Sequence, residues 1–91
     1  AYRFPSGTYV DMRVIAYLPI PKSKSKTVQQ KMRSGEIRPT VKPDFDNIGK
    51  LIADALNKVA YDDDKCIVDA QVRKFYSDNP RTEVILQIAT I

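Results

Sequence analysis

Two groups of aspartates are the candidates for chemistry in this 91-residue chain: the pair Asp44 and Asp46, and the consecutive run 62–64. Oxygen ligands of such charge density suit Mg²⁺, for which Mn²⁺ can substitute. A bound cation would neutralise the repulsion between the carboxylates, lower the pKa of a bound water and polarise a phosphodiester. Lys50, between the two groups, would place a positive charge near the scissile phosphate. The residue types therefore favour metal-dependent phosphodiester hydrolysis.

A purely structural alternative explains part of the same pattern. Asp44 or Asp46 can cap the helix that begins there. Asp46, Lys50 and Asp54 are spaced by four, so they form one row on that helix, where salt bridges contribute roughly 0.2–0.5 kcal/mol per pair. Asp62 can be a turn residue. The two acidic groups meet only if the sheet brings them together, which the sequence leaves open.

Composition excludes several other site classes. The chain has no histidine, so a Cys/His zinc site and histidine-based triads are excluded within it. Cys66 is the only cysteine, which excludes an intrachain disulfide and fits a reducing compartment. We therefore expect a cytoplasmic protein. The apolar runs are far shorter than the ~20 residues that span a bilayer, so no membrane partner is expected.

Charge is divided unevenly along the chain. Residues 1–43 carry nine Lys or Arg and two acids, whereas residues 44–69 carry three Lys and seven Asp. A basic segment beside an acidic cluster predicts a phosphate-binding surface around a metal site. A solvated surface with uneven charge is the alternative.

The pattern of apolar residues predicts the elements that position these side chains. Residues 9–18 alternate and indicate a half-buried strand, followed by a basic segment at 22–42 where a short helix near 27–33 or a loop is expected. An apolar stripe containing Ile48, Leu51 and Ile52 predicts a helix from about Asp46. Residues 66–76, with Val68, Ala70 and Val72 inward, and residues 82–91 indicate two strands. The turn at 77–80 predicts that they form an antiparallel hairpin.

These elements predict one small α+β domain over residues 1–91, with a mixed or antiparallel sheet and a helix packed on one face. A chain this short is only marginally stable alone, which favours partner subunits. Phe45 is expected to anchor the motif loop in the core. The aromatic residues Tyr2, Phe4, Tyr9 and Tyr17 are expected in the core or in dimer contacts, with stacking on unpaired bases as the alternative.

The ordered set Lys42-Pro43-Asp44-Phe45-Asp46-Asn47, Lys50, Asp54-Ala55-Leu56-Asn57 and 61–64 resembles the signature of the RusA Holliday junction resolvases. These are small, often phage-encoded endodeoxyribonucleases that act as homodimers on four-way DNA junctions. The resemblance covers about residues 42–88. It implies a RusA-like fold, catalysis by metal-site acids and a lysine, and a role in recombination and repair.

The resemblance also implies roles for individual residues. The catalytic residues would be Asp44, Asp46, Asp64 and Lys50. The metal would be held by the three acids among these together with Asp63. Lys74 would contact DNA, and basic residues of the preceding segment are further candidates for phosphate binding: Lys22, Lys24, Lys26 and Lys42.

The sequence departs from the family in two places. Cys66 stands where the family usually has glutamine. The part before the first strand is shorter than usual, so we expect that the domain lacks some N-terminal residues. The leading hypothesis is a Mg²⁺-dependent endodeoxyribonuclease that cuts branched DNA as a homodimer. The alternatives are a non-catalytic module that binds branched DNA with the same fold, and a small structural domain.

Overall fold

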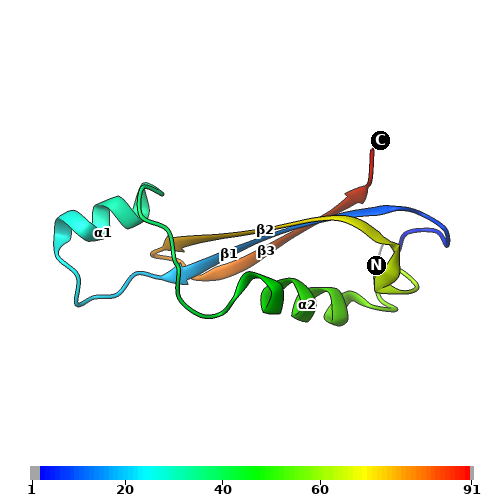
Figure 1. Cartoon of the computed structure of the whole chain (residues 1–91), viewed down its shortest axis with the longest axis horizontal. Coiled ribbons are helices and arrows are strands. Elements are labelled where there is room, and N and C mark those ends of the chain that lie inside the picture. The colour runs from blue at the N-terminus through cyan, green and yellow to red at the C-terminus, as the bar shows by residue number, and fades with distance from the viewer. Residues whose placement is uncertain (1–2, 91) are drawn as a thin grey trace.

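The alternating residues 9–18 form the central strand of the fold. The computed structural model describes residues 3–90, with the side chain of Asp64 outside that description. In it β1 (Val10–Pro19) lies between β2 (Ile67–Ser77) and β3 (Arg81–Ile88). β1 is parallel to β2 and antiparallel to β3. The predicted α+β domain with a mixed sheet and a helix on one face is confirmed (Figure 1).

The predicted antiparallel hairpin of the last two strands is wrong. The chain does turn between β2 and β3, but the strand order is β2-β1-β3, so both pair with β1 and not with each other. β1 is the strand whose apolar side chains are most completely covered: Val10 and Val14 have 0% exposure. In the central position β1 has a neighbouring strand on each side. The turn residues at 77–80 do not indicate this strand order.

A bulge corrects the predicted inward face of β2. Val10 pairs with Ile67 and Asp11 pairs with Asp69, so Val68 is an extra residue between two aligned pairs. Val68 is 54% exposed, and its predicted inward position is wrong. Val72 packs against the core as predicted.

Helix α2 (Phe45–Leu56) covers one face of the sheet (Figure 1). A core cluster of Met12, Val14, Ala16 and Ile48 joins β1 to the helix. Ile52 packs against this cluster, whereas Leu51, in the same predicted stripe, is 69% exposed. The helix is therefore predicted correctly, but its apolar stripe is wider than the surface that the sheet covers.

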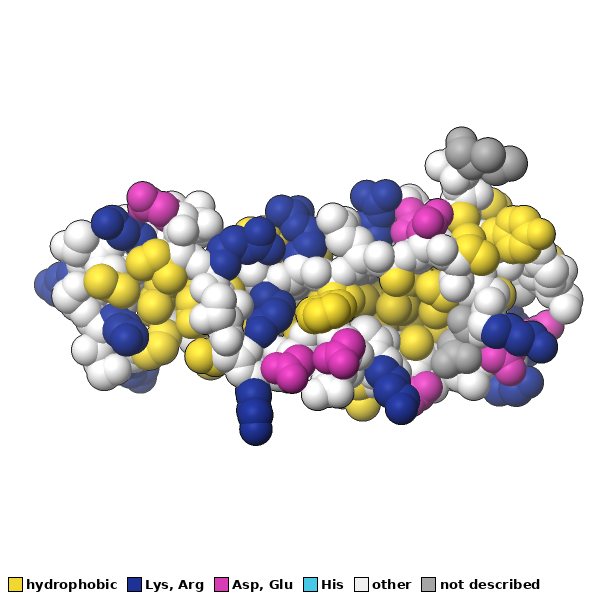
Figure 2. All heavy atoms as spheres, in the orientation of Figure 1, with side chains coloured by type: hydrophobic (Ala, Val, Ile, Leu, Met, Phe, Trp, Pro, Cys, Tyr) yellow, Lys and Arg dark blue, Asp and Glu magenta, His cyan; other side chains and the backbone are white. Residues whose placement is uncertain are grey.

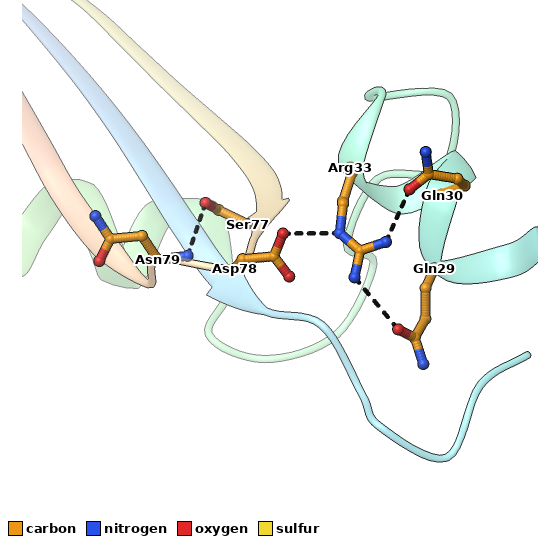
Figure 3. Close-up of polar contacts among 6 residues, drawn as sticks. All are labelled: Gln29, Gln30, Arg33, Ser77, Asp78 and Asn79. Atoms are coloured by element: carbon orange, nitrogen blue, oxygen red, sulfur yellow. Dashed lines mark hydrogen bonds and ion pairs between the residues drawn. The ribbon is translucent and has the colours of Figure 1, made fainter. Parts of the chain in front are cut away.

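The basic segment contains α1 (Lys26–Arg33), which the sequence left open between helix and loop. The Ser25 hydroxyl accepts the Val28 N–H over 3.3 Å, the bond of a helix N-cap. Arg33 Nε donates to Asp78 Oδ2 in the β2–β3 turn over 2.7 Å, and its other nitrogens donate to the Gln30 and Gln29 side chains (Figure 3). This contact anchors α1 beside the end of the sheet.

The molecule is elongated, with principal extents of 50 × 25 × 22 Å. Its radius of gyration is 15.6 Å, compared with about 12 Å for a compact domain of this length. Figure 1 shows why: α1 lies beyond one end of the sheet and the N-terminal loop beyond the other. Neither helix of the described chain has the length and apolar character needed to cross a bilayer.

Candidate metal and DNA site

Asp44 and Asp46 flank the first residue of α2, and both carboxylates are exposed. Asp44 occupies the N-cap position with extended backbone, yet its side chain makes no capping hydrogen bond. Asp46 Oδ1 accepts only the neighbouring Asn47 N–H, over 3.0 Å. The Asp44 side chain therefore does not cap the helix, whereas Asp46 accepts one of the first-turn N–H groups that lack an intrahelical acceptor. Neither carboxylate takes part in an ion pair within residues 3–90, so both can bind a cation.

The linker before Asp44 is fixed to the edge strand β2. Lys74 Nζ donates to the Val41 carbonyl, and Arg38 Nε donates to the Lys74 carbonyl over 3.1 Å. The Lys42–Pro43 peptide that follows is cis. Lys74, predicted to contact DNA, therefore lies beside the aspartate motif with its ammonium bonded to the backbone that leads into it.

Lys50 and Asp46 border the same cavity, which lies between α2 and β2 and has a volume of about 610 Å³. Phe45 also lines it and is 67% exposed, so the predicted anchoring of Phe45 in the core is wrong. The Lys50–Asp54 salt bridge is absent: no ion pair within the described part of the chain involves either residue. The ammonium of Lys50 is therefore available to an incoming anion at this cavity.

The second acidic group lies beyond the other end of α2. Asp62 forms an ion pair with Arg3, and a hydrogen bond with Ser6 together with the charge of Arg3 lowers the pKa of Asp62. Asp63 Oδ1 accepts the Lys65 N–H over 3.0 Å. Asp64 begins the short 3-10 helix η1 (Asp64–Cys66), and its side chain lies outside the described part. The contacts of Asp62 are with the N-terminal segment, and its turn role stays a prediction.

The length of α2 separates the two acidic groups. A 12-residue helix is about 18 Å long, whereas two ligands of one Mg²⁺ lie only about 4 Å apart because each metal–oxygen bond is about 2.1 Å. Asp44 and Asp46 stand together at the N-terminal end, and Asp63 stands past the C-terminal end. Within the residues whose side chains are described, no three acidic side chains gather as a metal site.

The remaining predicted DNA contacts lie toward α1. Lys22, Lys24 and Lys26 are exposed there, and Lys42 is exposed next to the motif. Figure 2 shows dark-blue side chains around the end that carries α1 and also along the rest of the molecule, with magenta side chains mostly over the middle and the opposite end. The charge division seen along the sequence is therefore only partly a division in space.

Sequence reasoning missed two arginines. Arg38 and Arg73 both stack on the Phe75 ring, with Cζ 4.2 Å and 4.8 Å from its centroid. Arg73 and Phe75 are two residues apart on one strand, so they lie on the same face of the sheet. This spacing could have been recognised in the sequence. Arg38 comes from the linker, 37 positions from Phe75, and no local pattern connects the two.

Comparisons with known proteins agree with the motif. Residues 2–87 match the protein family described as endodeoxyribonuclease RusA. A protein of Bacillus subtilis (strain 168), described as uncharacterized protein YqaN, is 49% identical over 80 residues. The match covers 86% of this chain and 56% of the relative, so the chain spans little more than half of that protein's length. No solved structure matches significantly.

Proposed function

Because this chain belongs to the RusA family of endodeoxyribonucleases, we propose that it hydrolyses phosphodiesters at Holliday junctions or other branched DNA, in recombination and repair, with Mg²⁺ as cofactor. One observation carries the proposal. Asp44 and Asp46 are exposed, take part in no ion pair within residues 3–90 and stand at the start of α2, beside the cavity that Asp46 shares with Lys50.

The residues present fit a hard divalent cation. Mg²⁺ is commonly held by one or two carboxylates together with substrate phosphate oxygens and water. Asp44 and Asp46 supply two such carboxylates without competition from a protein cation. When bound, the metal supplies Lewis acidity and a water of lowered pKa.

The chain's own groups would orient the phosphate at this site. The first turn of α2 directs backbone N–H groups and the positive end of the helix dipole toward an anion. Lys50 lies one turn further along, on the row of Asp46, and would hold its ammonium against the scissile phosphate or the leaving oxygen. Lys42 and the exposed lysines near α1 would bind flanking phosphates.

The experiment is cleavage of a labelled four-way junction in Mg²⁺. Wild type should release nicked products, and Asp46→Asn should lose most of this activity. Asp54→Asn is the matched control, because it makes the same charge change eight residues further along the helix. Equal cleavage by wild type and Asp46→Asn would refute the role of Asp46.

We propose in addition that the protein acts as a homodimer. Its accessible surface is 6456 Å², against about 5,400 Å² expected for a compact monomer of its mass. Exposed apolar residues lie on the α2 face of the sheet and on the helix: Leu51 at 69%, Ile88 at 61% and Val84 at 37%. Apolar surface of this kind supports self-association. Sedimentation should give a dimer for wild type and a monomer for Leu51→Glu, with Val68→Glu as a control.

Dimerisation offers a physical route to a complete acid set. Two-fold symmetry with the axis perpendicular to α2 makes the two copies of this helix antiparallel. The N-terminal end of one helix then lies near the acidic turn of the other copy. We propose that Asp64, supported by Asp63, joins Asp44 and Asp46 across such an interface.

Mixing two inactive variants tests this arrangement. Asp46→Asn and Asp64→Asn subunits form a heterodimer in which one composite site keeps every acid. Nicking should therefore return on mixing. If both acids act within one chain, the mixture stays as inactive as its parts.

The alternative function is a non-catalytic module that binds branched DNA. The lack of a three-acid group among the described side chains favours it. It predicts junction binding that needs no metal, and no cleavage under any metal condition.

A further inference from the structure

The face of the sheet opposite α2 carries a row of arginines stacked on aromatic rings. Tyr17 of the central strand is in register with Phe75 of β2 on one side and Arg81 of β3 on the other. The Tyr17 and Phe75 rings stack with centroids 6.1 Å apart and planes inclined by 27°. Arg81 Cζ lies 3.9 Å from the Tyr17 centroid, and Arg38 and Arg73 stack on Phe75. We name Arg38, Arg73 and Arg81 the arginine row.

Two of the three arginines in the row have no carboxylate partner within residues 3–90. Arg33 is paired with Asp78, and Arg81 with Glu83 over 2.9 Å. Arg38 and Arg73 take part in no ion pair within residues 3–90. Arg38 uses one of its five donors on the Lys74 carbonyl. Both side chains are exposed, so uncompensated positive charge faces solvent here.

Stacking makes these guanidiniums ready to bind. A cation over an aromatic ring is attracted by the ring's quadrupole, and the contact restricts a side chain that is otherwise flexible. Less conformational entropy is then lost when the guanidinium engages a ligand. The segment around the row adds to its field: residues 22–42 contain seven basic residues and one acidic residue, a net charge of +6. Figure 2 shows dark-blue side chains along the border of the sheet opposite α2, next to the α1 end.

Charge and geometry select the occupant. The guanidiniums stack over two rings, Phe75 and Tyr17, whose centroids are 6.1 Å apart. That spacing matches about two nucleotide steps of 3.4 Å along a DNA strand. Guanidinium groups bind phosphate oxygens bidentately. A second copy of the chain would bring an identical arginine row against this one, which charge repulsion opposes.

We propose that the arginine row binds the phosphate backbone of a duplex arm of DNA, on the side of the sheet opposite the Asp44–Asp46 site. The identity of the ligand as DNA rests on the proposed function, but the surface is separate from the aspartate motif. One molecule would then contact branched DNA on two faces of a thin sheet. The two faces would hold two arms apart.

Binding without cleavage tests this inference. The affinity for a labelled four-way junction is measured by fluorescence anisotropy in Ca²⁺ over a series of NaCl concentrations. The proteins compared are wild type, Arg73→Gln, Arg38→Gln and Arg73→Lys. Arg13→Gln is the matched control, because Arg13 lies on the same face but is paired with Asp11 over 3.3 Å. Circular dichroism confirms that each variant is folded.

Each glutamine variant should bind the junction several-fold more weakly than wild type. The slope of log affinity against log salt should become smaller in magnitude by about 0.9, the value for one lost phosphate contact. Arg73→Lys should keep the slope, and Arg13→Gln should match wild type. Wild-type slopes in Arg73→Gln and Arg38→Gln would overturn the inference while leaving the nuclease proposal intact. The inference would also be overturned by a glutamine variant whose sedimentation mass changes while its salt slope does not. The arginine row would then be a contact between copies of the chain. Failure of wild type to bind the junction would refute the nuclease proposal itself.

Discussion

The ammonium of Lys74 in β2 donates a hydrogen bond to the backbone carbonyl of Val41, three residues before Asp44. A strand residue thereby holds the linker from which the aspartate motif emerges. The same strand residue accepts, through its own carbonyl, the Nε–H of Arg38. These two bonds fasten the linker to the open edge of the sheet, so the placement of Asp44 depends on a residue 30 positions later in the chain.

The first prediction follows from this bond. Lys74→Met keeps the apolar stem but removes the donor, so the linker should loosen and junction cleavage in Mg²⁺ should fall about 10- to 100-fold, as for lost groups that orient metal ligands. The salt slope of DNA binding should change little. A slope lowered by about 0.9 would instead identify Lys74 as a direct phosphate contact.

The second prediction concerns the docking of α1. Removing the guanidinium in Arg33→Ala breaks its bonds to Asp78 and to the two glutamines. Because the pair is exposed, the melting temperature should change little. Amide exchange within Lys26–Arg33 should rise by about tenfold, since local opening there becomes easier. Unchanged exchange would show that apolar contacts of Met32, which is 5% exposed, hold α1 without the pair.

The third prediction concerns pH. Asp11 is 8% exposed and accepts the Gln87 amide over 2.9 Å, and this bond, with Arg13, lowers the pKa of Asp11. A carboxyl whose folded pKa lies below its unfolded value of about 3.9 stabilises the fold above that pH and loses the effect as pH falls through the folded value. Asp11→Asn should therefore melt lower than wild type near neutral pH. The difference should shrink below about pH 4, and a difference constant with pH would contradict this account.

The fourth prediction concerns Gly49 in the middle of α2. A Cβ added there would lie 3.4 Å from Val72 Cγ2, at the short end of ordinary contact. Alanine is favoured over glycine inside a helix by about 1 kcal/mol, so Gly49→Ala should raise the melting temperature by up to about 4–8 °C. A destabilised Gly49→Ala would show that the contact with Val72 cannot relax.

Local pattern was sufficient for the elements and for the motif. The alternation in residues 9–18 and the stripe from Ile48 predicted β1 and α2, because the side-chain periods of strands and helices are direct consequences of backbone geometry. The order of Asp44, Asp46, Lys50 and the acidic turn identified the family, which the match over residues 2–87 confirms. These features need only neighbours along the chain.

The tertiary structure determined which strands pair and which side chains are covered. The sequence predicted a β2–β3 hairpin, but β1 lies between them because the most apolar strand gains most from a central position. The sequence also predicted that Phe45 lies in the core. The sheet covers a narrower part of α2 than the apolar stripe, and Phe45 is exposed. The stacking of Arg38 on Phe75 depends on a contact between distant segments. The aspartates could therefore be chosen from the sequence, and the length of α2 separates their two groups. Only the packing of distant segments decides which groups contact the linker and the arginines.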